Sequence, residues 1–189
     1  MSKTCNNQLE QVHHIFDILH GKAPADLLIK NLQILDVHGE TVYDGSLLVD
    51  GGRIVALNPE ESAVQVKEVF DGQGLYAIPG LIDAHLHFES QLAHPVALGE
   101  AMVPNGTTTI FAECLDLIGS AGEDGLEAFK MLFKDYDKLP YRVFAFAPGK
   151  KVPAAITQEI IKLDPVIGLG EFEHFSYSSG SEDDFKKAA

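Results

Sequence analysis

The chain has 189 residues, of which 46% are hydrophobic and 22% are charged, as in an ordinary soluble globular protein. Its 28 acidic residues outnumber its 14 lysines and arginines, and the formal charge of −14 argues against a nucleic-acid or anionic-membrane partner, because phosphate groups bind basic surfaces. Two cysteines are too few for a disulfide framework, the polar first residues do not resemble a signal peptide, and no window is apolar enough to span a membrane. We therefore expect a cytoplasmic protein with reduced cysteines that binds a small molecule.

The first part of the chain is predicted to be a short helix followed by a small β module. Apolar residues recur at helical spacing from Gln8 to Leu19, so residues 1–24 are assigned to an N-terminal helix. Strand-like runs follow at residues 27–29, 34–37, 46–49, 53–57 and 64–70, with turn residues at 38–40, 43–45 and 50–52. Asp50-Gly51-Gly52 is a strong hairpin signal. We expect residues 25–77 to form an antiparallel β module whose thin core packs against another element.

After Tyr76 the pattern changes to an alternation of strands and helices. The predicted strands are residues 78–87, 106–113, 141–147 and 166–171, and the predicted helices are residues 96–103, 123–136 and 156–163, with a last helix beginning near Ser181. Successive strand and helix units imply a parallel sheet, either open and doubly wound or closed into an eight-fold barrel. No glycine-rich phosphate loop follows the first strand, which favours the barrel.

Two histidines, His85 and His87, end the first of these strands. Alternate side chains of a strand face the same way, so both imidazoles would point to one spot, and Asp83 on the same face could orient a ring. Neutral imidazole is a common metal ligand, and a rigid pair suits zinc, iron or manganese. Two ordinary histidines in a polar loop are the alternative. His94, beside Pro95, is predicted to begin a helix.

Acidic residues end the second and fourth predicted strands. Glu113 follows a run of β-branched residues, and Glu171 follows Gly168-Leu169-Gly170, where glycines allow a ligand to approach closely. The carboxyl ends of parallel strands are where such folds place their sites. Glu171 could face the histidines across a barrel mouth and bridge two metal ions, or it could form a surface ion pair.

Three neighbours of these acids have weaker signals. Cys114 has no activating group near it in the sequence, so we expect a packed thiol rather than a nucleophile. Glu173 and His174 could touch a substrate, although an exposed loop pair is the simpler interpretation.

Residues 79–87 resemble the signature of the amidohydrolase superfamily, and four segments in order resemble the adenine deaminase family: residues 25–31, 85–90, 106–109 and 168–171. The resemblance implies a metal-dependent (β/α)8 barrel joined to a small β-sandwich, and hydrolysis of adenine to hypoxanthine and ammonia. It implies that His85 and His87 bind one of two divalent metal ions (Mn, Fe or Zn) and that Glu171 bridges to the second. Glu89 and Glu113 are further candidates for contact with the aminopurine substrate.

The chain also departs from the family pattern. The family usually has Asp-Pro-His-Glu where this chain has Glu113-Cys114-Leu115-Asp116, so the sequence does not identify the substrate. The superfamily places further metal-binding histidines and a catalytic aspartate on later strands, so residues 78–189 are expected to be the first half of a barrel from an enzyme that is a homo-oligomer at full length. Two alternatives remain: a dihydroorotase or hydantoinase type, which normally has a carbamylated lysine in place of Glu171, and a truncated remnant without catalysis.

Overall fold

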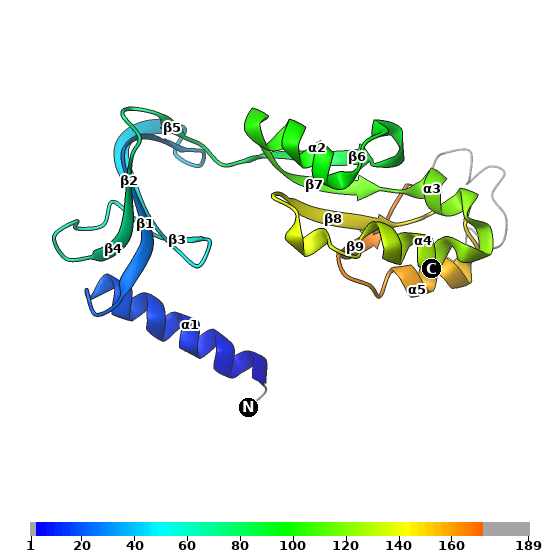
Figure 1. Cartoon of the computed structure of the whole chain (residues 1–189), viewed down its shortest axis with the longest axis horizontal. Helices are drawn as coiled ribbons and strands as arrows, with labels where there is room; N and C mark the ends of the chain where they lie inside the picture. Colours follow the sequence, from blue (N-terminus) through cyan, green and yellow to red (C-terminus); the bar gives the residue numbers. More distant parts are fainter. Residues whose placement is uncertain (1–2, 172–189) are drawn as a thin grey trace. The chain divides into compact units, whose positions relative to one another are not determined.

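The computed structural model describes residues 3–171, and the chain divides into two compact units between Pro79 and Gly80 (Figure 1). The last predicted helix, beginning near Ser181, lies outside the described residues. Among the helices within the described residues, none is long and apolar enough to cross a membrane.

The first unit contains one helix and one five-stranded sheet. Its elements are α1 (Lys3–Leu19), β1 (Pro24–Asp36), β2 (Thr41–Asp50), β3 (Arg53–Leu57), β4 (Gln65–Asp71) and β5 (Tyr76–Ala77). The strand order is β3-β2-β1-β4, and β5 pairs with the far end of β1. The buried core of this unit is small, as expected: Ile18, Ala25, Leu28 and Leu48 form one cluster, and Leu32 and Ile34 are the other buried apolar residues in its described part.

The sheet of the first unit is mixed, so the expectation of an antiparallel module is wrong for part of it. β2 pairs antiparallel with β1 and β3, whereas β4 and β5 run parallel to β1. The sequence pattern identifies a strand but not its direction, because side chains alternate in the same way in both kinds of pairing.

Two predicted turns of the first unit have opposite outcomes. The hairpin at residues 50–52 is confirmed, and Gly51 and Gly52 both have positive φ angles, which such tight turns require. The turn predicted at residues 43–45 is wrong, because these residues lie inside β2. A Cβ on Gly45 would overlap the side chains of Ile34 and Asn58, so this glycine makes room for neighbours and does not turn the chain.

The second unit is an α/β unit built on a four-stranded sheet. Its elements are β6 (Leu81–His87), α2 (Pro95–Met102), β7 (Thr107–Glu113), α3 (Leu115–Ser120), α4 (Gly125–Leu132), β8 (Arg142–Ala147), α5 (Ala154–Ile160) and β9 (Val166–Leu169). The strands lie in the order β6-β7-β8-β9 and all pair in parallel (Figure 1). The predicted parallel sheet is therefore confirmed.

The helices of the second unit differ from the prediction in detail. The helix predicted over residues 123–136 is shorter, and α3 was not predicted. Six residues are too few for a helical period to be recognised, but Leu115 and Ile118 of α3 are buried in the core. This core surrounds Phe129 of α4, which packs against Phe133 with ring centroids 4.6 Å apart.

The packing of α4 predicts the effect of two substitutions on stability. Phe129 is 1% exposed and Met131, on the same helix, is 78% exposed. We expect Phe129→Ala to lower the free energy of unfolding by about 3–5 kcal/mol, because the substitution leaves a cavity in the core. The matched control Met131→Ala should change it by no more than about 0.5 kcal/mol. Urea unfolding of the two variants checks this, and equal losses would contradict the described core.

Candidate metal centre

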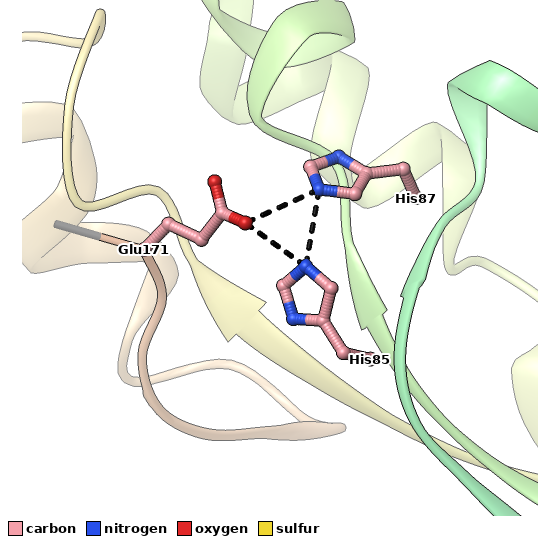
Figure 2. Close-up of side chains that lie close together, drawn as sticks. All are labelled: His85, His87 and Glu171. Atoms are coloured by element: carbon pink, nitrogen blue, oxygen red, sulfur yellow. Dashed lines mark hydrogen bonds and ion pairs between the residues drawn. The ribbon is translucent and has the colours of Figure 1, made fainter. Parts of the chain in front are cut away.

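Three side chains meet at the carboxyl end of the parallel sheet (Figure 2). His85 and His87 project from β6, and Glu171 lies two residues beyond the end of β9. The two Nε2 atoms are 3.1 Å apart, and Oε1 of Glu171 lies 3.0 Å from Nε2 of His85 and 3.5 Å from Nε2 of His87. The structure therefore brings together the three residues that the sequence suggested as metal ligands, although Glu171 lies 84 positions after His87 in the chain.

The backbone of β6 is irregular where it presents the histidines. The register with β7 shifts between Leu81 and Ile82 and again between Asp83 and Leu86, and is regained where His87 pairs with Glu113. The Asp83 side chain accepts a hydrogen bond from the backbone N–H of His85 at 3.1 Å. Asp83 thus holds the strand backbone, whereas the sequence had suggested contact with a histidine ring.

Glu89 fixes the orientation of His87. Its Oε1 lies 3.3 Å from Nδ1 of His87 and also accepts a hydrogen bond from the backbone N–H of Asp116 at 3.1 Å. When Nδ1–H donates to this carboxylate, the lone pair of Nε2 points to the cluster, which is the tautomer that a metal ligand needs. Burial by itself lowers the pKa of His87, but the hydrogen bonds and charges of Glu89 and Glu171 outweigh it, so the pKa is raised.

Glu171 is held on three sides. Its backbone N–H donates to Oε1 of Glu113 at 2.7 Å, its own Oε1 faces the histidines, and its Oε2 lies 3.7 Å from Nζ of Lys150. Burial by itself raises the pKa of this carboxyl, but the hydrogen bond with His87 and the positive charges around it lower the pKa overall. Glu171 is therefore ionised near neutral pH.

The arrangement fits a divalent metal ion. Two imidazole nitrogens and a carboxylate oxygen within 4.8 Å of one another are ligands that zinc, iron and manganese accept. Ligands about 2.0–2.2 Å from a tetrahedral metal stand about 3.3–3.6 Å from one another, close to the separations seen here. Because Oε1 faces the histidines and Oε2 faces Lys150, the described residues provide one set of three ligands on one side of the carboxylate.

The remaining candidates lie near this cluster or outside it. Cys114 is fully buried, and burial raises the pKa of its thiol, as expected of a packed cysteine. His94 precedes α2, where its side chain accepts a hydrogen bond from the N–H of Val96 at 3.3 Å, as a helix-start residue should. Glu173 and His174 lie outside the described residues.

Lys150 is the site residue that the sequence did not suggest. It is 6% exposed, follows β8 by three residues and lies against Glu171. A single lysine in a turn carries no recognisable motif. Its position just after the third predicted strand could have indicated a place near the site, because the carboxyl ends of all four parallel strands lie at one edge of the sheet.

Comparison with known proteins identifies relatives of similar sequence. No family model matches the chain. It is 47% identical over 135 residues to an adenine deaminase of Desulforamulus reducens, covering 71% of this chain and 22% of that protein. It is 36% identical over 180 residues to adenine deaminase 1 of Latilactobacillus sakei, covering 88% of this chain and 30% of that protein. The chain thus spans less than a third of the length of these two relatives.

Two solved structures share the fold. L-Hydantoinase from Arthrobacter aurescens matches with a TM-score of 0.59 and 17% identity, covering 77% of this chain and 32% of that one. N-acyl-D-glutamate deacylase from Bordetella bronchiseptica, complexed with zinc and a phosphonate inhibitor, matches with a TM-score of 0.51 and 16% identity, covering 78% of this chain and 38% of that one. At this level of identity the likeness concerns the α/β fold alone.

The cluster predicts that the purified protein takes up a divalent metal ion through these side chains. We expect His87→Ala and Glu171→Ala each to weaken zinc or manganese binding by at least about 100-fold, because each removes a ligand and not only an outer partner. His38→Ala is the matched control, since His38 is exposed and belongs to the first unit. Isothermal titration measures the affinities, and unchanged binding in His87→Ala would contradict the assignment.

Proposed function

We infer that this chain, which belongs to the adenine deaminase family, is the N-terminal portion of a metal-dependent amidohydrolase. The complete protein is proposed to hydrolyse adenine to hypoxanthine and ammonia. The observation that carries this proposal is the meeting of His85, His87 and Glu171 at one edge of a parallel sheet, in a chain that is similar to adenine deaminases over most of its length.

The proposed architecture follows from the same premise. The sheet β6-β7-β8-β9 supplies the first four strands of a (β/α)8 barrel, which begins near residue 78, and residues 25–77 belong to a small β-sandwich preceded by the N-terminal helix. The parallel order of the four strands supports this proposal, as does the likeness in fold to L-hydantoinase. The cytoplasmic location and the homo-oligomeric state remain predictions from the sequence.

Each residue of the cluster has a proposed task in the reaction. His85 and His87 would hold a divalent metal ion through their Nε2 atoms, and Glu89 would keep His87 in the tautomer that frees this nitrogen. Glu171 supplies an ionised oxygen on the opposite side and is proposed to bridge to a second metal ion. When bound, such a cation provides Lewis-acid activation of the water that attacks the carbon bearing the amino group.

The surroundings of Glu171 bear on the bridging role. Nζ of Lys150 lies 3.7 Å from Oε2, the carboxylate oxygen that does not face the histidines. A cation held by this oxygen would compete with the ammonium group of Lys150. We propose that the complete protein has further metal ligands and a catalytic aspartate. They would lie in the part that corresponds to the regions of the relatives that this chain does not cover.

A second reading, a hydantoinase or dihydroorotase type, differs in its bridging group. Those enzymes normally use a carbamylated lysine where Glu171 stands, and a glutamate at this position supports the deaminase instead because its side chain has no amine to carbamylate. The two hypotheses predict different substrates, so activity assays with those substrates distinguish them.

We expect the complete protein, loaded with manganese, iron or zinc, to release ammonia from adenine and to leave hydantoin and dihydroorotate unchanged. Glu171→Gln should lower kcat/KM for adenine by at least about 100-fold, because an amide is a poor ligand for these metals. His38→Ala should retain the wild-type value. A coupled ammonia assay measures all three proteins, and turnover of hydantoin without turnover of adenine would favour the second reading.

A further inference from the structure

We propose that Glu113 is a positioning residue, which holds the backbone of Glu171 at the distance from the histidine pair that metal binding requires. This inference rests on the proposed function for its purpose, since it assigns a role toward the metal ligands. It also revises the expectation from the sequence that Glu113 contacts the aminopurine.

The first observation is a hydrogen bond that joins two segments far apart in the chain. Oε1 of Glu113 accepts the backbone N–H of Glu171 at 2.7 Å, across 58 residues. β7 and β9 are not neighbours, because β8 lies between them. Gly170 still bonds to β8, its N–H donating to the carbonyl of Ala147 at 2.7 Å. The chain thus leaves β8 after residue 170, and the Glu113 carboxylate receives the next N–H group.

The second observation is the glycine before Glu171. A Cβ on Gly170 would overlap the carboxyl group of Glu113, so only a residue without a side chain lets this carboxyl lie against the backbone. The φ angle of Gly170 is not in the positive range that favours glycine. The need for glycine at this position therefore comes from the Glu113 carboxyl and not from a turn.

The third observation connects Glu113 to the histidines. Glu113 pairs with His87 in the parallel ladder, and its carbonyl accepts the backbone N–H of Phe88 at 3.2 Å. One residue therefore bonds through its main chain to the strand end that carries both imidazoles, and through its side chain to the segment that carries the third ligand. A displacement of Glu113 would change the separation of the two halves of the site.

Burial argues against a direct contact between Glu113 and a substrate. Glu113 is 0% exposed, and it is not among the three residues whose ligand atoms gather at the cluster. Its Oε2 is buried and has no hydrogen-bond partner among the described residues. Burying a carboxyl group that lacks a full set of hydrogen bonds is unfavourable for folding. The hydrogen bond that its other oxygen accepts from Glu171 accounts for its presence.

The test compares three variants of the complete protein by cobalt binding and by hydrogen exchange. Glu113→Gln keeps an acceptor oxygen, Glu113→Leu removes it, and Gly170→Ala pushes the carboxyl away. Glu100→Leu, on the exposed surface of α2, is the matched control. We expect Glu113→Leu and Gly170→Ala to weaken Co²⁺ binding about 10–100-fold and to alter its visible absorption spectrum, as loss of an outer partner does. The cobalt affinities of Glu113→Gln and Glu100→Leu should stay within about threefold of the wild-type affinity.

Hydrogen exchange tests the hydrogen bond without any metal. The Glu171 amide should be protected from exchange in the wild type and in Glu113→Gln, and should lose protection in Glu113→Leu and Gly170→Ala. Equal protection and equal cobalt affinity in Glu113→Leu would overturn the inference. Should Glu113→Leu fail to fold, the contrast between Glu113→Gln and Gly170→Ala decides in the same way.

The two readouts distinguish failure of the inference from failure of the proposed function. A wild-type protein that binds no cobalt would contradict the metal site, while the exchange pattern would still report on Glu113. A wild-type protein that binds cobalt, with all variants alike in affinity and exchange, would contradict only the role of Glu113.

Discussion

Parallel pairing of β6, β7, β8 and β9 is the constraint on which the site depends. Since all four strands run in one direction, their carboxyl ends reach the same edge of the sheet. The side chains of the candidate site lie at or just beyond these ends: the histidine pair on β6, Glu113 on β7, Lys150 after β8 and Glu171 after β9. Residues distant in sequence become neighbours through the backbone hydrogen bonds of the sheet, and helices fill the intervals between strands.

The candidate site gathers three carboxyl groups around the histidine pair, and this arrangement bears on how it could hold a cation. Glu89 and Glu171 contact the imidazoles, Glu113 holds the backbone of Glu171, and Nζ of Lys150 lies 3.7 Å from Oε2 of Glu171. Burial raises the pKa of Glu113, an effect that the hydrogen bond from Glu171 only partly offsets, and one buried oxygen of Glu89 also has no partner among the described residues. These groups oppose folding when no ligand is present, and a divalent cation would relieve their repulsion.

The sequence predicted the parts of the fold and the site that have strong local signals. Strand and helix periodicity located all four parallel strands, and the spacing of His85 and His87 indicated that both rings share a face. The direction of β4 was not predictable, because it depends on the path of the connecting loop. The inward position of Glu113 and the contact of Lys150 with Glu171 depend on how distant segments pack, and no local pattern encodes them.

The spacing of the ligands along the chain also determines when the site can exist during synthesis. The two imidazoles belong to a single strand of seven residues, but the carboxylate belongs to a segment that leaves the ribosome only after β7, β8 and β9 have been made. A growing chain that ends before residue 171 therefore presents two histidines without the third ligand, and its hold on a metal ion is weak. A metal ion held by all three side chains could therefore be bound only after residue 171 has been made.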